Sequence, residues 1–176
     1  MKDIPYAFTV GSLMYVQVCT RPDIAFVVGM LARYQSNPGL DHWRAAKKVM
    51  RYLQGTKDYM LMYRWMHNLE VIGYLDSDFA GCIDSYKSTS GYIFLLASGA
   101  ISWSSAKQTL TATLTIAAEL VSCFEATSHG VWLKSFISGL RILDSIPRPL
   151  SIYCDNSAAV LWPKTTKVEV EVHTST

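Results

Sequence analysis

The sequence lacks four features that each point to a class of protein. Its 16 basic and 14 acidic residues leave a net charge of +2, so no excess of one sign indicates a nucleic-acid or membrane partner. Its four cysteines form no C-x-x-C pair and stand at no zinc spacing from a histidine, which favours reduced thiols. No apolar run approaches the roughly 20 residues of a membrane helix, and the first residues contain no apolar signal-peptide core. We expect an intracellular protein, cytoplasmic or nuclear, without a membrane partner.

The residues that are present predict a folded α+β protein. Half of them are hydrophobic and 17% are charged, a composition typical of globular domains. The first 56 residues carry apolar side chains at helical spacing. They predict one helix over 5–20, a second that follows Thr20 and ends before residue 37, and a third over 42–55 that Asp41 caps.

Four basic residues lie on one face of the third predicted helix. Because neighbours on a helix surface are three or four residues apart, they form a continuous basic surface. A solvated helix face and a contact surface for backbone phosphates both account for this pattern. The four residues are Arg44, Lys47, Lys48 and Arg51.

The rest of the chain changes from helical period to short aromatic and β-branched runs. The order predicts an antiparallel meander, two helices, a buried-type strand and a further short helix, with a domain boundary near residues 64–70. The predicted strands are 58–65, 69–78, 91–98, 99–105 and 148–155, and the predicted helices are 113–129, 130–143 and 156–162.

Acidic residues at the ends of the predicted strands suggest a metal site. Asp76 and Asp78 lie on the same side of a strand, and Asp78 either lines the rim of a site or organises the turn to Gly81. A lone pair of this kind is common near turns. Glu119 borders the apolar arc of its helix, however, and Asp155 ends a buried-type strand. If these elements pack together, Asp76, Glu119 and Asp155 meet and need hard cations such as Mg²⁺, which in pairs activate water for phosphodiester cleavage.

Long motifs in the same order make the sequence recognisable. They are "GYLDSDFAGCIDSYKSTSGYIFLL", "GAISWSSAKQ", "AELVSCFEA" and "YCDNSAAV". These motifs resemble the ribonuclease H (RNase H) region of copia-type retrotransposon Pol polyproteins, and the residues before them resemble the stretch that follows the polymerase active site. The resemblance implies a mixed five-stranded sheet whose first three strands form an antiparallel meander, with helices on its faces. It also implies hydrolysis of the RNA strand of an RNA–DNA hybrid with Mg²⁺, or Mn²⁺ in its place, inside a larger Pol polyprotein.

The resemblance assigns the roles of single residues. Asp76, Glu119 and Asp155 match the acidic metal ligands of the first strand, the helix and the "CDN" motif. Glu169 is a candidate fourth ligand, and its alignment needs a gap. Asn156 is a candidate for positioning the substrate backbone, and it serves equally well as a helix N-cap. The corresponding domains are a helical connection segment at 1–66, an RNase H-like domain at 67–161, and a truncated or disordered tail at 162–176.

Two features of the sequence depart from the family pattern. It reads "TIAAEL" where the family usually has "STEAEY", and it contains no Y-x-D-D polymerase pair. Lys87 and Ser88 are candidates for a phosphate contact, but a turn rich in serine, threonine and glycine explains them as well. The sequence therefore predicts an RNase H-type nuclease. The alternatives are a catalytically dead fragment with at most weak nucleic-acid binding, and an interaction protein that uses the helical segment.

Overall fold

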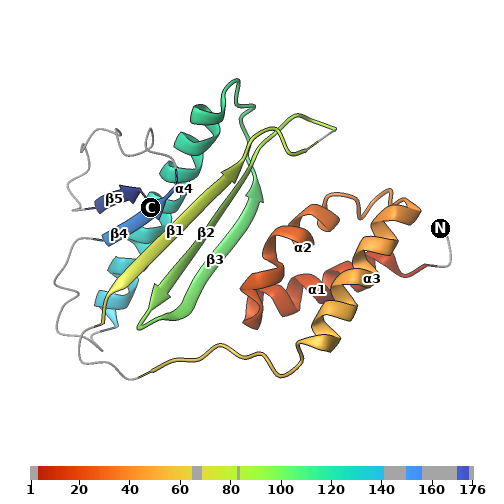
Figure 1. Ribbon diagram of the computed structural model, residues 1–176, viewed down its shortest axis with the longest axis horizontal. Coiled ribbons are helices and arrows are strands. Elements are labelled where there is room, and N and C mark those ends of the chain that lie inside the picture. Colours follow the sequence, from red (N-terminus) through yellow and green to blue (C-terminus); the bar gives the residue numbers. More distant parts are fainter. Residues whose placement is uncertain (1–3, 65–68, 83, 141–149, 156–169, 175–176) are drawn as a thin grey trace. The chain divides into compact units, whose positions relative to one another are not determined.

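The computed structural model describes residues 4–64, 69–82, 84–140, 150–155 and 170–174. The chain divides into two compact units, Met1–Met62 and Tyr63–Thr176, whereas the predicted boundary followed residue 66 (Figure 1). Within the described ranges, no helix combines the length and the hydrophobicity that crossing a membrane requires.

The first unit is a small bundle of helices. It contains α1 (Tyr6–Thr20), the 3₁₀ turn η1 (Pro22–Ile24), α2 (Ala25–Ala32) and α3 (Leu40–Gly55). Three helices were predicted here and three are present. The N-cap of α3 differs from the prediction: Gly39 donates its N–H to Nδ1 of His42 at 2.8 Å, and Asp41 lies inside the first turn. The buried core of this unit consists of Tyr6, Val10, Leu13, Ile24, Val28, Leu31, Ala46 and Val49.

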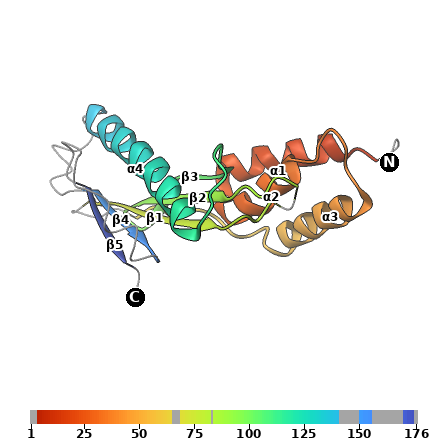
Figure 2. The ribbon, with the colours of Figure 1, turned by 90° about the horizontal axis from the view of Figure 1, so that it is seen from above.

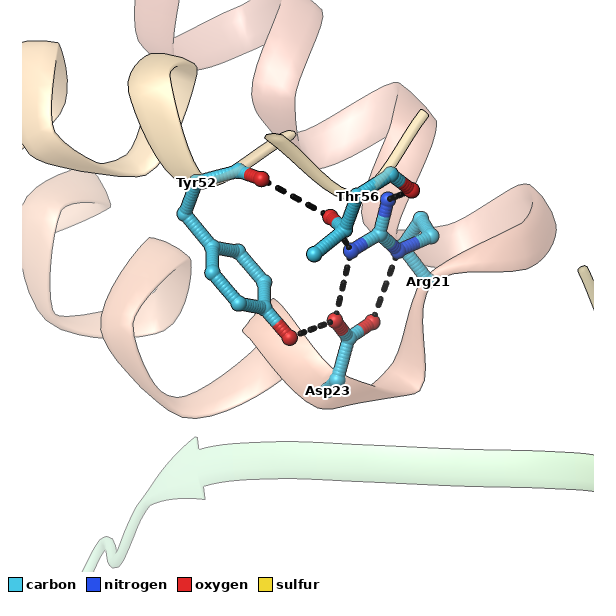
Figure 3. A network of polar contacts seen from close by, with 4 residues as sticks. All are labelled: Arg21, Asp23, Tyr52 and Thr56. Atoms are coloured by element: carbon cyan, nitrogen blue, oxygen red, sulfur yellow. Dashed lines mark hydrogen bonds and ion pairs between the residues drawn. The ribbon is translucent and has the colours of Figure 1, made fainter. Parts of the chain in front are cut away.

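A buried arginine joins the start of η1 to the end of α3 (Figure 3). Arg21, only 8% exposed, donates from Nε and Nη2 to the two carboxylate oxygens of Asp23 at 2.9 and 2.7 Å. Nη2 also donates to Oγ1 of Thr56 at 2.7 Å, and Nη1 to its carbonyl at 3.3 Å. The Tyr52 hydroxyl completes the network by donating to Asp23 at 2.8 Å. Both carboxylate oxygens of Asp23 and three nitrogens of the guanidinium therefore have partners.

The second unit is a five-stranded mixed sheet in the order β3-β2-β1-β4-β5. β1 and β2 pair antiparallel, as do β2 and β3, whereas β4 runs parallel to both β1 and β5. Figure 2 shows the single long helix α4 lying along one face of this sheet. The predicted α+β fold, with its antiparallel meander, is confirmed. The elements are β1 (Val71–Asp78), β2 (Thr89–Leu96), β3 (Gly99–Lys107), α4 (Thr115–Gly139), β4 (Leu150–Cys154) and β5 (Val170–Thr174).

A glycine in the middle of α4 allows the helix to pack closely on the sheet. A Cβ added at Gly130 would lie 2.5 Å from Cδ2 of Leu150 and 2.9 Å from Cε1 of Phe94. Phe94 is fully buried at the centre of the core between α4 and the sheet. The prediction of two helices that meet at residues 129 and 130 was wrong, because this glycine serves close packing rather than helix termination.

Two further predictions need correction. Residues 58–64 form no strand, and Tyr59, Met60 and Met62 are exposed by 60% or more. No described strand of the sheet pairs with this segment. The tail at 162–176 was predicted to be truncated or disordered; of this tail the structure describes 170–174, where disorder is wrong because Val170–Thr174 forms β5 parallel to β4.

Candidate metal centre

The two strand carboxylates lie at the same edge of the sheet because β1 and β4 run parallel. Their pairing ends at Tyr74 and Tyr153, each of which precedes an acidic residue by two positions. Asp76 and Asp155 therefore lie just beyond the last residues that pair β1 with β4, and both are exposed. The carboxyl ends of parallel strands are a common place for ligands to bind.

The helix α4 supplies the third carboxylate from its second turn. Glu119 is only 4% exposed, and its Oε2 atom has no hydrogen-bond partner among the described residues. One carboxylate oxygen from each of Asp76, Glu119 and Asp155 lies within 4.8 Å of the other two. The structure thus brings together the three acidic residues that were predicted as ligands from distant parts of the sequence.

Burial and like charge act together on the buried carboxylate. The pKa of Glu119 is raised, mainly because burial disfavours the charged form. The carboxylates of Asp155 and Asp76 raise this pKa further, whereas the Ser77 hydroxyl opposes the rise. A bound cation would compensate both effects, because it neutralises the repulsion and gives the buried oxygen a partner.

These three residues fit a small divalent cation. Carboxylate oxygens are the ligands that Mg²⁺ prefers, and Mg²⁺ also keeps water and phosphate oxygens in its coordination shell. One oxygen of each carboxylate lies within 4.8 Å of the others, so small side-chain movements would let a single cation bind between them. The unpartnered Glu119 oxygen is the observation that favours an ion over a simple acidic surface.

Asp78 does not belong to this centre and instead organises the turn that follows β1. Its Oδ1 atom accepts a short hydrogen bond from the N–H of Thr89. A Cβ added at Gly81 would overlap the Asp78 carboxylate, so the side chain fills the space that this glycine leaves. Asp78 was predicted either to line the rim of the site or to organise the turn to Gly81, and the structure shows that it organises the turn.

The two residues predicted as phosphate contacts near this turn have structural partners. Nζ of Lys87 donates to the carbonyl of Thr109 at 2.6 Å. Ser88 is fully buried, and its hydroxyl accepts from the N–H of Ala80 at 3.1 Å. These bonds are sufficient to explain both side chains, and a contact with phosphate stays a prediction.

The basic residues of α3 belong to the first unit, and the three carboxylates belong to the second. Arg44 pairs with Asp41 at 2.8 Å, and both side chains are well exposed. Nζ of Lys47 lies 5.9 Å from the centre of the Trp43 ring. Lys48 and Arg51 are also exposed, so the predicted basic face is present on the helix and its nucleic-acid contact stays a prediction. Asn156 and Glu169 lie outside the described residues.

Sequence reasoning missed two buried polar residues beside Glu119. Gln108 is 1% exposed, and its Nε2 donates to Oγ of Ser90 at 3.0 Å and to the carbonyl of Ala118 at 2.9 Å. Ser122 is fully buried, and its hydroxyl donates to the carbonyl of Asp76 at 3.0 Å. The sequence carries little signal for either residue, because glutamine and serine are mostly exposed in proteins and their burial is visible only in the structure.

Retrovirus-related Pol polyproteins of plant transposons align with most of the chain. The polyprotein of transposon TNT 1-94 from Nicotiana tabacum is 42% identical over 160 residues, which cover 91% of this chain and 12% of the polyprotein. That of transposon RE2 from Arabidopsis thaliana is 40% identical over 154 residues, which cover 88% of this chain and 10% of the polyprotein. The Secreted RxLR effector protein 161 of Plasmopara viticola is 44% identical over 133 residues, which cover 76% of this chain and 94% of the effector.

The chain belongs to the copia-type retrotransposon Pol family. The resemblance found in the sequence is thereby confirmed. As a Pol segment the chain spans only about a tenth of the polyproteins it matches, 12% and 10% of their lengths. No family model matches the sequence. A foamy viral protease–reverse transcriptase, solved in complex with double-stranded DNA, aligns with 80% of this chain and 30% of its own length. The sequence identity is 12% and the TM-score is 0.46, a similarity too low to support the fold.

Proposed function

We propose that this Pol segment is an RNase H-type nuclease that hydrolyses the RNA strand of RNA–DNA hybrids within a larger Pol polyprotein. Asp76, Glu119 and Asp155 would hold Mg²⁺, or Mn²⁺ in its place. The observation that supports this proposal most is the convergence of the three carboxylates, together with a buried oxygen of Glu119 that has no hydrogen-bond partner among the described residues.

The exposure of two of the three carboxylates suits a phosphodiester substrate. Metal ions bound there would supply an activated water and stabilise the charge on the leaving oxygen. Asp76 and Asp155 are exposed at the edge of the sheet, where a nucleic-acid backbone has access. Glu119 anchors the site from its buried side, because burial leaves its carboxylate little freedom. Without a cation, three clustered negative charges would repel a phosphate group.

Cleavage of a labelled hybrid tests the proposal. The full chain is incubated with an RNA–DNA hybrid in Mg²⁺ or Mn²⁺, and compared with Asp76→Asn and Glu119→Gln. We expect a loss of more than about 100-fold for each variant, because a direct ligand should matter more than the outer-shell partners whose loss costs roughly 10- to 100-fold. Glu125→Gln, on the same helix and outside the cluster, is the matched control and should cleave at the wild-type rate. Equal rates for wild type and Asp76→Asn would sink the assignment.

A non-catalytic Pol remnant is the second candidate. It is favoured by the altered "TIAAEL" motif, which puts Ile116 at the start of α4 with 48% of its surface exposed. A salt-sensitive shift of the hybrid in a gel, without cleavage in either metal, would support a binding module. Absence of both the shift and cleavage would support an inert fragment.

A further inference from the structure

Two hydrogen bonds bracket Glu119 and tie its helix to the sheet. Ahead of it, the carbonyl of Ala118 accepts from Nε2 of Gln108 at 2.9 Å. One turn later, the Ser122 hydroxyl donates to the backbone carbonyl of Asp76 at 3.0 Å. The first bond thus fixes the peptide unit that leads into Glu119, and the second joins α4 to the strand residue that carries another carboxylate of the site.

Gln108 is itself held rigidly at the end of β3. It directly follows Lys107, the last residue of that strand, and its N–H donates to the carbonyl of Ser88 at 2.8 Å. Its side chain also donates to Oγ of Ser90 on β2 at 3.0 Å. Gln108 is 1% exposed, so water has little access to replace its bonds. A donor anchored in this way can fix the position of the helix carbonyl that it contacts.

Farther along α4, His129 shares a hydrogen bond with the Ser102 hydroxyl of β3 at 2.7 Å, and the buried contacts between α4 and the sheet are otherwise largely apolar. The core consists of side chains such as Phe94, Cys123, Ala126 and Leu133. Apolar burial is not directional, so it holds the helix on the sheet without strictly fixing its rotation or its height along the strands. Hydrogen bonds do constrain both, since they weaken steeply away from a narrow range of distance and angle.

We propose that Gln108 and Ser122 are positioning residues of the carboxylate site. They hold α4 at the rotation and height that keep Glu119 within reach of Asp76 and Asp155. Neither residue ligates an ion; both act through the backbone next to a ligand. This inference rests on the proposed function, because it assumes that the three carboxylates bind a divalent cation.

Binding of Mn²⁺ alone to the full chain tests the inference without measuring activity. Free Mn²⁺ is followed by electron paramagnetic resonance in wild type, Gln108→Met and Ser122→Ala. Methionine keeps the volume of the glutamine side chain and removes its hydrogen bonds. We expect each substitution to weaken Mn²⁺ binding by about 10-fold, the scale of outer-shell effects. Ser135→Ala is the matched control, because the Ser135 hydroxyl donates to Val131 within α4 itself, and its affinity should be unchanged.

A parallel urea titration separates positioning from stability. Affinities are compared under conditions in which every variant is folded. If Ser122→Ala and Gln108→Met lose stability but bind Mn²⁺ within twofold of wild type, the inference is overturned. If Gln108→Met does not fold, Ser122→Ala decides alone by the same criterion. Glu119→Gln gives the reference for a lost ligand: if it binds Mn²⁺ as well as wild type, the proposed function itself fails.

Discussion

Each unit of this chain contains a cluster of charged groups, and the two clusters differ in how completely they are partnered. Around Arg21, positive and negative charge are matched, and the Asp23 carboxylate accepts from the guanidinium and from Tyr52. Around Glu119, three acidic residues meet, and one buried oxygen has no partner among the described residues. The first arrangement is complete as it stands, whereas the second needs a cation or a proton.

This difference separates structural from functional charge. A fully bonded ion pair contributes to the fold, and its removal leaves a buried group uncompensated. A cluster of like charge opposes folding until something binds to it, and such clusters are typical of functional sites. The two clusters should therefore respond in opposite ways when a charged member is removed.

The largest effect on stability is expected in the first cluster. Arg21→Ala removes the guanidinium from the Asp23 carboxylate and leaves it the Tyr52 hydroxyl and a backbone N–H. We expect the free energy of unfolding to fall by about 3 kcal/mol, near the lower end of values for broken buried pairs, because Asp23 is partly exposed. Urea unfolding of the full chain measures the change. Arg44→Ala breaks an exposed pair with Asp41 and should cost less than about 0.5 kcal/mol. A similar small cost for Arg21→Ala would show that its network adds nothing.

Two acidic residues of β1 should have opposite roles: Asp78 should contribute to stability and Asp76 to metal binding. Asp78→Asn weakens the hydrogen bond to the Thr89 N–H, so we expect a loss of about 1–2 kcal/mol in stability and no change in Mn²⁺ affinity. Asp76→Asn should cost little stability without metal and abolish most Mn²⁺ binding. Urea unfolding and Mn²⁺ titration of the two variants measure both quantities. If Asp78→Asn weakened Mn²⁺ binding as much as Asp76→Asn does, the separation of their roles would be wrong.

The sequence allowed the acidic cluster to be predicted because its motifs are long and ordered. The resemblance identified Asp76, Glu119 and Asp155, and strand alternation and helix periodicity placed each beside the core. What local patterns could not give is which side chains fix these residues in space. Gln108 and Ser122 bond across three elements that are far apart in the sequence, so their roles appear only after folding.

Long-range packing also explains the errors in the fold. Gly130 resembles a helix terminator in the sequence, yet its missing side chain leaves space that Leu150 and Phe94 occupy. The alternating residues of β5 looked like a polar tail, and their pairing with β4 is a parallel contact between separate segments. The run at 58–64 had the composition of a strand, yet it pairs with no strand among the described residues.

Removing the buried carboxylate should stabilise the metal-free protein. Glu119→Gln removes a buried negative charge and its repulsion by Asp155 and Asp76. These are the effects that raise the pKa of Glu119. We expect a gain of about 1 kcal/mol, the scale of two charges about 4 Å apart in water. Thermal unfolding in a chelator measures it, and added Mg²⁺ should raise the Tm of wild type but not of the variant. A lower Tm for Glu119→Gln in chelator would mean that this carboxylate serves the fold.

The smallest effect is the pH dependence of the first unit. The hydrogen bond from Arg21, followed by weaker contributions from Tyr52 and the charge of Arg21, lowers the pKa of Asp23 against the opposing effect of burial. Since the folded pKa is below the unfolded one, the ionised carboxylate stabilises the unit above the ordinary carboxyl range, near pH 4. This contribution is lost as the pH falls through the folded pKa. Hydrogen exchange of α3 amides should therefore accelerate below about pH 4 beyond its intrinsic pH dependence, and Asp23→Asn should remove that additional acceleration. Its persistence in Asp23→Asn would assign the acid sensitivity to another group.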